Sequence, residues 1–354
     1  MINIRYYSSD HGLGHVSRDI AIIKELIKVP GVRVFVRNLS GSKLFADSFN
    51  KKVGVTPKRN DFGVINKKND FSTDNEGTYS RLSEWKSTWD DFLKEEKRFC
   101  NGNDISIIVS DISPQPFILA NDLGIPSVAV SNFTWHCIYS SLFGKNDPLV
   151  KDIGDSYRLA SKSIILPFEQ DNMILPSQTK TGLVCRDIEK SRSEIRNMLG
   201  VSKRDFLIFV SMGFSMENMP GFKIPEMPKG IRLVSNQLPN AIRIPSNFYN
   251  SQDIVAASDL VACKSGYTTV AESVSKKVPM VITARDGFVD DEAICSKVEK
   301  LGIGMRIPNR DFLSMDYLSN CMEFASRAKE QYNSLPKRFS SLHNEEVARI
   351  ILSC

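Results

Sequence analysis

The chain has 354 residues, of which 42% are hydrophobic and 25% charged. The length predicts two domains of roughly 150 to 200 residues each, and the composition excludes a long disordered chain, a collagen and a coiled-coil rod. Lys and Arg number 46 against 41 Asp and Glu, and without a concentrated basic run this balance gives no electrostatic support for binding nucleic acid.

The apolar runs are far shorter than the roughly 18 residues that cross a bilayer. We therefore expect no membrane span, which leaves room for peripheral membrane contact. The N-terminus lacks the pattern of a secretory signal, and the seven cysteines are widely spaced without a Cys-x-x-Cys pair. A cytoplasmic protein with reduced thiols is the expectation.

In the first half, short β-branched runs alternate with helical or polar segments, which predicts parallel βαβ units. Apolar residues from Val16 to Ile27 recur at spacings of four, three and four, so they form one stripe of a first helix that ends near Pro30. A second long helix is expected over about 79–99. The expected strands are 2–6, 32–36, 105–109, 127–130 and 164–166.

The pattern restarts after the polar segment 189–196, with expected strands at 206–210, 231–234, 260–263 and 280–282. Two Rossmann-like α/β domains are implied, covering 1–175 and 176–337. The cleft between two such domains is the default ligand site.

The first expected strand runs directly into a loop with two glycines, Gly12 and Gly14, before the first helix. A Walker phosphate loop is excluded because no Gly-Lys-Ser/Thr follows. A dinucleotide loop matches only in part, since Ser17 replaces the third glycine and Arg37 stands where an acidic residue is usual. A zinc site at His11 and His15 would need a continuous helix.

A further interpretation is that His15 or His11 is a neutral general base acting on an acceptor hydroxyl. Two of the four histidines in the chain lie in this loop, which favours chemistry over simple loop packing. A base histidine needs a partner on its other ring nitrogen. Asp111 is the candidate because it follows the strand 105–109, although it is also suited to capping the next turn.

The second half contains a strand, a tight turn at Lys264, Ser265 and Gly266, and then a helix. Backbone N–H groups at such a helix start attract phosphate, and hydroxyl donors follow at Thr268 and Thr269. Glu272, one helical turn after Thr268, is placed to accept hydrogen bonds from ribose hydroxyls. The alternative for Glu272 is an exposed position on the helix surface.

At this point a family resemblance is plain. The segment 259–272 resembles the donor signature of GT-B nucleotide-sugar glycosyltransferases, in which a glycine turn precedes Thr-x-x-Glu. The loop 10–18 is similar to the acceptor loop of bacterial N-acetylglucosaminyltransferases that complete lipid II, with His15 at the start of the first helix. The segments 11–15, 109–112, 130–135, 190–196 and 264–270 resemble the N-terminal, glycosyltransferase-like half of plant arabinokinases.

The resemblance implies a GT-B fold whose C-terminal helix, within about 338–354, crosses back to the first domain. It also places an acidic residue and then Gln beside the donor sugar, where this chain has Asp290 and Asp291. The galactokinase-type domain of arabinokinases has no counterpart in these 354 residues, so no kinase activity is implied. The expected catalytic residues are His15, Asp111 and His11, and the expected donor-binding residues are Gly14, Gly213, Phe214, Ser215, Lys264, Ser265, Gly266, Tyr267, Thr268, Thr269, Glu272, Asp290 and Asp291.

The expected reaction moves a hexosyl or N-acetylhexosaminyl group from a nucleoside-diphosphate sugar, with uridine as the expected base, to a hydroxyl acceptor. We expect inversion by single displacement without a metal or cofactor. The acceptor, whether a glycan, a lipid-linked or a small molecule, has no recognisable motif in 39–104. A nucleotide-sugar epimerase of the same fold and a non-catalytic nucleotide-sugar-binding protein stay as alternatives.

Overall fold

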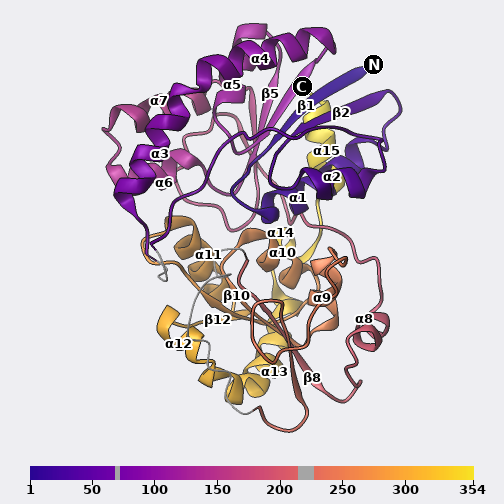
Figure 1. Cartoon of the computed structure of the whole chain (residues 1–354). Coiled ribbons are helices and arrows are strands. Elements are labelled where there is room, and N and C mark those ends of the chain that lie inside the picture. Colours follow the sequence, from indigo (N-terminus) through magenta and orange to yellow (C-terminus); the bar gives the residue numbers. More distant parts are fainter. Residues whose placement is uncertain (68–71, 214–226) are drawn as a thin grey trace. The chain divides into compact units, whose positions relative to one another are not determined.

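Figure 1 shows the computed structural model of the chain, which describes residues 1–67, 72–213 and 227–354. The chain forms two compact units. The first comprises Met1–Asn66, Thr73–Val184 and His343–Cys354, and the second contains Cys185–Leu342 together with Lys67 and Ser72. The chain changes unit at 184–185 and 342–343, whereas the sequence placed these changes at 175–176 and 337–338.

The first unit is built on a seven-stranded parallel sheet in the order β3-β2-β1-β4-β5-β6-β7. Its central strands are apolar runs buried on both faces, as parallel sheets covered by helices require. The strands are β1 (Ile2–Ser8), β2 (Val32–Arg37), β3 (Gly54–Thr56), β4 (Ile107–Asp111), β5 (Ser127–Ser131), β6 (Lys162–Ile165) and β7 (Gln178–Lys180).

The helices of the first unit follow the strands in alternation, as the sequence predicted. They are α1 (Leu13–Leu26), α2 (Ser42–Phe49), α3 (Asn75–Ser87), α4 (Trp89–Gly102), α5 (Gln115–Leu123), α6 (Trp135–Phe143), α7 (Pro148–Arg158) and the C-terminal α15 (Asn344–Leu352). The predicted long helix 79–99 was wrong in one respect, because it is two helices that meet at Thr88.

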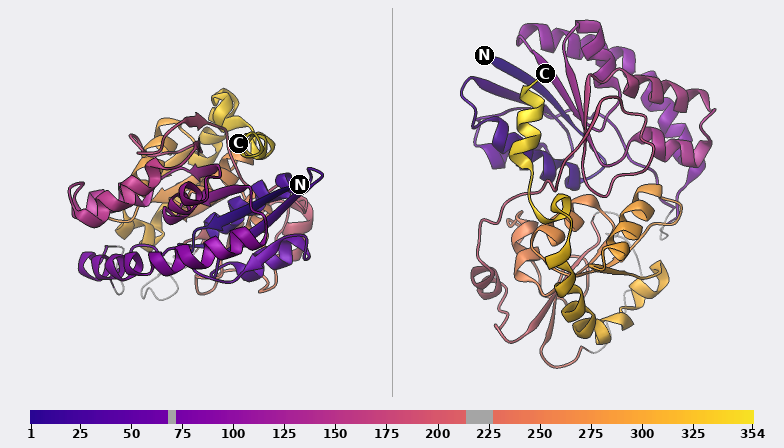
Figure 2. Two further views of the ribbon diagram at one scale, coloured as in Figure 1. Left: turned by 90° about the horizontal axis from the view of Figure 1, so that it is seen from above. Right: turned by 180° about the vertical axis from the view of Figure 1, so that it is seen from behind.

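The predicted return of the C-terminal helix to the first domain is confirmed. Helix α15 packs against α1 in the first unit, and the right view of Figure 2 shows this yellow C-terminal helix beside the strands of that unit. Val347, Ala348 and Ile351 form its buried face. His343, the residue before α15, packs tightly against Gly182, because a Cβ on Gly182 would lie 2.1 Å from the His343 ring.

The second unit has a five-stranded parallel sheet in the order β12-β11-β10-β8-β9. Its strands are β8 (Phe206–Ser211), β9 (Ile231–Val234), β10 (Leu260–Lys264), β11 (Met280–Thr283) and β12 (Gly304–Arg306). The helices are α8 (Arg192–Met198), α9 (Ser251–Ala257), α10 (Tyr267–Ser275), α11 (Val289–Lys300), α12 (Asn309–Ser314), α13 (Cys321–Gln331) and α14 (Lys337–Ser340).

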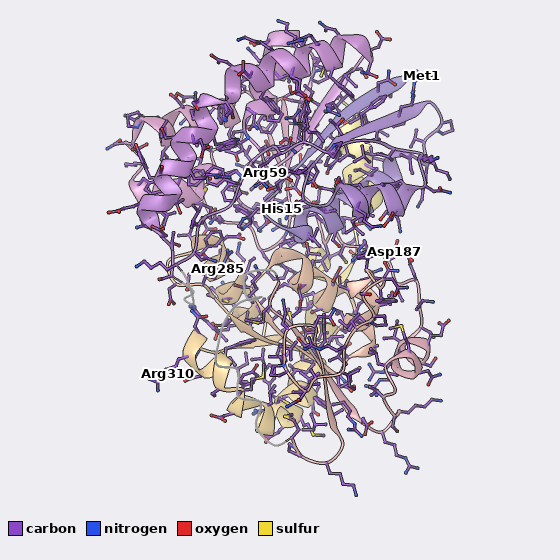
Figure 3. The ribbon with its side chains drawn as sticks, viewed as in Figure 1. Met1, His15, Arg59, Asp187, Arg285 and Arg310 are labelled. Atoms are coloured by element: carbon purple, nitrogen blue, oxygen red, sulfur yellow. The ribbon has the colours of Figure 1, made fainter. Side chains whose placement is uncertain are left out.

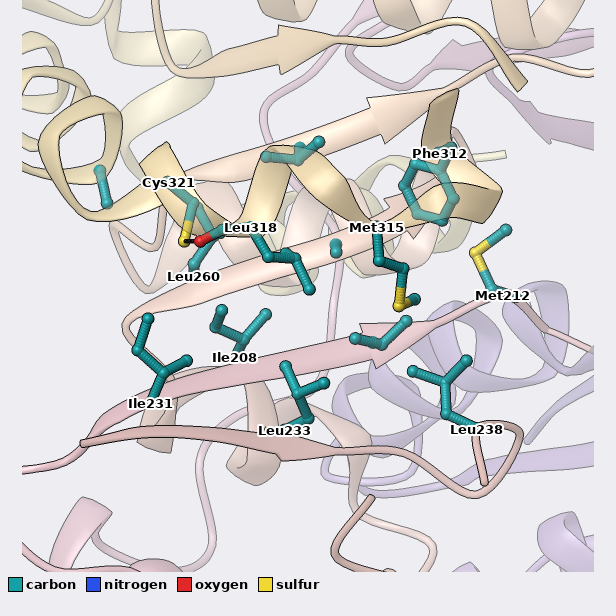
Figure 4. Close-up of a cluster of buried hydrophobic side chains, with 14 residues drawn as sticks. Ile208, Met212, Ile231, Leu233, Leu238, Leu260, Phe312, Met315, Leu318 and Cys321 are labelled. Atoms are coloured by element: carbon teal, nitrogen blue, oxygen red, sulfur yellow. Dashed lines mark hydrogen bonds between the residues drawn. The ribbon is translucent and has the colours of Figure 1, made fainter. Parts of the chain in front are cut away.

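One face of this second sheet forms a hydrophobic core, drawn in Figure 4. Ile208 on β8 and Leu260 on β10 pack beneath Phe312 of α12 and beneath Met315 and Leu318 of the turn that follows it. All five side chains are fully buried. This packing orients the two central strands whose ends carry the predicted donor residues.

A buried ion-pair cluster joins the first sheet to α4. Glu96 accepts two hydrogen bonds from Arg5, at 2.8 and 3.0 Å, one from Arg37 at 2.8 Å and one from the hydroxyl of Tyr7 at 2.6 Å. Burial opposes ionisation of Glu96, but the hydrogen bonds and charge of Arg5, together with the charge of Arg37, outweigh it and lower the pKa of the carboxyl group. The carboxylate therefore holds α4 on the sheet.

We predict that Glu96→Ala lowers the free energy of unfolding by about 3 to 5 kcal/mol, because it leaves two buried guanidinium groups without their shared carboxylate. Since the folded pKa of Glu96 is lowered, its contribution is present above the ordinary Glu pKa of about 4.3 and is lost as the pH falls through the lowered value. Urea denaturation at pH 7 and in acid measures both effects. Glu84→Ala on exposed α3 is the control and should change little; equal effects of the two variants would contradict the prediction.

Candidate active site

The predicted site residues follow the two neighbouring strands of each sheet between which the strand order changes sides. In the first sheet the order changes sides between β1 and β4, and in the second between β8 and β10. Ligands of open parallel sheets bind at such switch points, beyond the carboxyl ends of the strands. His15 follows β1 and Asp111 ends β4, whereas Gly213 follows β8 and Lys264 ends β10.

A buried carboxylate, Asp61, ties together the loops at the carboxyl edge of the first sheet. One of its oxygens accepts hydrogen bonds from the hydroxyl of Ser9 at 3.0 Å and the backbone N–H of Asp10 at 2.7 Å. The other accepts from the hydroxyl of Ser113 at 2.8 Å and the indole N–H of Trp135 at 3.0 Å. The loops after β1, β4 and β5 thus share one anchor.

Asp10 extends this anchoring to the other side of the sheet. Its carboxylate accepts hydrogen bonds from the backbone N–H groups of Leu39, Ser40 and Asn60, at 2.9, 2.8 and 2.7 Å. These bonds attach the segments after β2 and β3 to the loop after β1. The glycine and histidine loop is therefore a rigid part of the sheet edge.

His11 lies in this loop with its ring edge-on to Trp135, at 5.1 Å between ring centroids. A Cβ on Gly63 would lie 1.7 Å from Nδ1 of His11, so only glycine permits this approach. The centroids of His11 and His15 are 6.4 Å apart. The loop accordingly brings both predicted histidines together, and the catalytic role of His11 stays a prediction.

His15 lies at the start of α1 (Figure 3), beside a buried network that the sequence predicted only in part. Its Nδ1 is 2.9 Å from an oxygen of Asp111, as the proposed base and partner require. Arg18, one helical turn later, donates to both oxygens of Asp111 and lies 2.9 Å from Nδ1 of His15. Arg18 also donates to the side-chain oxygen of Asn132, at 2.6 Å.

The charges in this network are paired. Burial opposes ionisation of Asp111, but the charge and hydrogen bonds of Arg18, together with the hydrogen bond of His15, hold the pKa of its carboxyl group well below its usual range. Burial and the nearby charge of Asp111 raise the pKa of Asp19 well above its ordinary value. Asp19 also accepts a hydrogen bond from the hydroxyl of Tyr6 at 2.8 Å.

In the second unit, Gly213 and Lys264 lie side by side. Gly213 has a φ of +62°, and a Cβ there would be 3.1 Å from Cε and 3.3 Å from Nζ of Lys264. Gln237 holds this turn by donating to the carbonyl of Gly213 at 2.5 Å and accepting from the N–H of Met212 at 2.9 Å. Burial, with the charge of Arg285, lowers the pKa of Lys264 to about 8.

The predicted turn and helix start are present after β10. Ser265 donates from its N–H and its hydroxyl to the carbonyl of Thr283, at 3.0 and 3.1 Å, which attaches the turn to β11. Helix α10 then begins at Tyr267 without a side-chain cap. Gly266 precedes it, and Thr268 and Thr269 lie in its first turn, so these residues are assembled as the sequence predicted.

Glu272 is buried, so the alternative prediction of an exposed position on the helix surface was wrong. Its carboxylate oxygens lie 3.4 and 3.2 Å from the hydroxyl of Ser251, which donates to them, and one lies 3.9 Å from a guanidinium nitrogen of Arg186. Arg186 also donates to the carbonyl of Tyr249 at 3.1 Å. A buried acidic residue is thereby held next to the loop that precedes α9.

Asp291 makes a two-pronged ion pair with Arg285. The guanidinium donates to both carboxylate oxygens, each at 2.8 Å, and the backbone N–H of Arg285 adds a third hydrogen bond at 2.9 Å. The guanidinium lies over the ring of Phe288, 3.6 Å from its centroid. Asp290 is buried beside this pair, while the predicted Phe214 and Ser215 lie outside the described residues.

The described residues contain no group of three His, Cys, Asp or Glu side chains arranged to hold a metal ion. Metal independence nevertheless stays a prediction about the reaction. Within the same described ranges, no helix combines the length and the apolar character needed to span a bilayer.

The site also contains side chains that the sequence did not predict, among them Arg18, Asn132 and Arg285. A signal existed for Arg18, since it lies three residues after His15 and therefore on the same side of α1. Asn132 directly follows β5, and Arg285 is the second residue after β11, at the edge where parallel strands collect functional groups.

No protein-family model matches the sequence. The chain is 26% identical over 326 residues to L-arabinokinase of Arabidopsis thaliana, which covers 87% of this chain and 30% of that protein, so the chain spans less than a third of its relative.

Several solved structures match nearly the full length. They include the glycotransferase of kitacinnamycin, with a TM-score of 0.66 and 15% identity over 99% of this chain and 98% of that one. Another is Phytolacca americana UGT2 complexed with UDP-2-fluoro-glucose and pterostilbene, with a TM-score of 0.67 and 13% identity over 100% and 99%. A third is the spinosyn rhamnosyltransferase SpnG, with a TM-score of 0.64 and 12% identity over 99% and 100%. Together with the two parallel-sheet units and the returning C-terminal helix, these similarities show that the chain has the GT-B fold.

Proposed function

We propose that the chain is a glycosyltransferase that moves a sugar from a nucleoside-diphosphate sugar to a hydroxyl acceptor. The observation that carries the proposal is the 2.9 Å contact between Nδ1 of His15 and the Asp111 carboxylate at the switch point of the first sheet. The GT-B fold supports it, and one structural neighbour was solved with UDP-2-fluoro-glucose and pterostilbene, a nucleotide sugar and an aromatic acceptor. We infer UDP as the carrier and a hydroxyl-bearing acceptor by analogy with that protein.

In the proposed step, the Asp111 carboxylate accepts a hydrogen bond from the Nδ1–H of neutral His15, and Nε2 takes the proton of the acceptor hydroxyl as His15 becomes an imidazolium. The acceptor oxygen forms a bond to the anomeric carbon while the bond from that carbon to the diphosphate breaks. The diphosphate leaves with the electron pair, and single displacement inverts the anomeric configuration. A product that retains the anomeric configuration of the donor would contradict single displacement.

On the donor side, we propose that the diphosphate lies against Gly213, Lys264 and the first turn of α10. The helix start contributes backbone N–H groups and Lys264 a positive charge, so negative charge on the leaving diphosphate is stabilised without a metal. Glu272 is the proposed acceptor for the ribose hydroxyls, held by Ser251 and Arg186. This assignment keeps the whole donor site on one unit.

The two acidic residues predicted to hold the donor sugar take different roles in this proposal. Both oxygens of Asp291 accept hydrogen bonds from Arg285, so Asp291 positions that guanidinium instead of binding sugar hydroxyls. Asp290 is left as the proposed sugar ligand. Whether the transferred group is a hexose or an N-acetylhexosamine is decided by the substrate panel described below.

A second candidate, a nucleotide-sugar-binding protein without catalysis, is favoured by one observation. The similarity to L-arabinokinase covers 30% of that protein, so in the relative the matching module accompanies other sequence. Such a protein would bind UDP-sugars and show neither transfer to an acceptor nor hydrolysis. An epimerase would instead convert the donor sugar in the absence of any acceptor.

We predict that His15→Ala lowers sugar transfer by about 10²- to 10⁴-fold, the usual contribution of a general base, with UDP affinity unchanged. The assay supplies UDP-glucose or UDP-N-acetylglucosamine with a panel of sugars and phenols and follows the best acceptor by mass spectrometry. His136→Gln, on half-exposed α6, is the matched histidine control. Full turnover in His15→Ala would remove His15 from the mechanism, and the absence of any turnover in the unmodified protein would favour the binding protein.

We also predict that UDP binding takes up protons in mildly alkaline solution. The pKa of Lys264 is lowered to about 8, so at pH 8.5 most of the side chain is neutral before binding, and a neighbouring diphosphate favours its charged form. UDP affinity should therefore fall as the pH rises above 8. Calorimetry at pH 8.5 in buffers of different ionisation enthalpy measures the proton uptake.

Two variants of Lys264 distinguish the effect of its positive charge on UDP affinity from the proton uptake caused by its titration. Lys264→Arg keeps a permanent cation, so UDP should still bind while the proton uptake disappears. Lys264→Met should lose the proton uptake and bind UDP more weakly. Equal proton uptake in all three proteins would show that Lys264 is not the group that responds to the diphosphate.

A further inference from the structure

We propose that Arg18 is a positioning residue for the reaction: it neutralises the Asp111 carboxylate and so keeps the His15 imidazole uncharged and ready to accept a proton. The catalytic meaning of this inference rests on the proposed function. The electrostatic coupling itself is a property of the folded first unit and is testable without any substrate.

The geometry of the three groups carries the proposal. Arg18 donates through Nε to one oxygen of Asp111 at 2.5 Å and through Nη2 to the other, which is the paired arrangement that guanidinium and carboxylate favour. That second oxygen is also the partner of His15 Nδ1, at 2.9 Å. All three side chains are at least nine-tenths buried, so water does little to screen their charges.

A histidine beside an unpaired buried carboxylate would gain a proton easily, because the imidazolium and the carboxylate attract each other. Here the carboxylate is already shared with a permanent cation, and Nη2 of that cation lies 2.9 Å from Nδ1. Protonation of His15 would place a second positive charge next to the guanidinium of Arg18. The arrangement keeps the hydrogen bond that orients the ring and removes most of the attraction that would charge it.

Other charged or titratable groups around His15 do not replace this effect. Asp19, on the same helix, accepts a hydrogen bond from Tyr6 of β1, and burial with the charge of Asp111 raises the pKa of its carboxyl group. His11, from the loop after β1, has its ring centroid 6.4 Å away. From the segment after β5, Phe133 packs edge-on against His15 without a charge. In the part of the chain that the structure describes, Arg18 and Asp111 are thus the charged groups within hydrogen-bond distance of the imidazole.

Asn132 gives the guanidinium its fixed orientation. Its side-chain oxygen accepts from Nη1 of Arg18 at 2.6 Å, on the edge opposite Nε. All three guanidinium nitrogens of Arg18 are therefore engaged, by Asp111 at the end of β4 and by Asn132 in the segment after β5. A lysine at this position would keep the charge but could not reproduce this planar set of contacts.

The test is nuclear magnetic resonance of the protein with ¹³C-labelled histidine, following the Cε1–H signal of His15 from pH 5 to 9. A spectrum of His15→Gln assigns the signal among the four histidines. In Arg18→Gln we expect the titration midpoint of His15 to rise by at least about one pH unit relative to the unmodified protein, because the carboxylate is then unpaired. In Arg18→Lys, which retains a cation, the midpoint should move by less than half of that.

A reverse variant protects the test if Arg18→Gln fails to fold. Asp111→Asn removes the anion and leaves Arg18 facing the imidazole, so the midpoint of His15 should fall. A midpoint that stays unchanged in Arg18→Gln, or that does not fall in Asp111→Asn, overturns the proposal. Both results are read without turnover, so they stand apart from any failure of the proposed transferase activity.

The same coupling has a kinetic readout once an acceptor is found. The acid limb of the pH–rate profile should move to higher pH in Arg18→Gln, so that transfer is depressed at pH 7 and recovers in more alkaline solution. A merely structural role of Arg18 would lower the rate equally at every pH. Arg18→Lys should restore most of the profile of the unmodified protein.

Discussion

The geometry of the first unit depends on buried carboxylates that accept hydrogen bonds from several loops at once. Asp61 alone joins the segments after β1, β4 and β5, and Asp10 adds those after β2 and β3. Loop backbone at a sheet edge has no ladder partner, so its N–H groups need acceptors of this kind. The backbone N–H of Ser9 also donates to the carbonyl of Asp111 at 2.6 Å. Because these bonds fix the loop, the histidine that opens α1 meets the carboxylate that ends β4.

In both units the site residues lie at the switch point of the sheet, but the arrangement of charged side chains there differs. At the switch point of the first sheet, the charges of Arg18 and Asp111 are paired, and burial raises the pKa of the neighbouring Asp19. At that of the second sheet, Lys264 and Arg285 lie near a single two-pronged partner, Asp291. A paired guanidinium and carboxylate suit a neutral hydroxyl and a neutral base, whereas the Lys264 side chain and the start of α10 suit a diphosphate. This contrast agrees with the proposed division into acceptor and donor sides.

The sequence predicted the central strands and the first helix well, because buried parallel strands and an apolar helical stripe leave strong patterns. It missed β3, β7 and β12, each three residues long, and β7 is fully exposed, so none leaves a hydrophobic run. The break at Thr88 was missed because the amphipathic pattern continues across it. The partners of site residues were equally hidden. Arg18 and Asp111 are 93 positions apart in the chain, and only the fold brings them together.

A motif predicts where a residue lies in the fold but not which side chains it contacts, so two residues that match a motif can have different roles. Asp111 and Asp291 both stand where a motif predicted a functional carboxylate, and both form two-pronged bonds to an arginine. In Asp111, one oxygen still reaches the imidazole at 2.9 Å, so the arginine modifies a carboxylate that retains a second task. In Asp291, three hydrogen bonds come from one residue, Arg285, and the carboxylate is committed to holding it. Asp291 is therefore a positioning carboxylate for Arg285, and Asp290 is the acidic residue of this motif that we propose as the contact with the donor sugar.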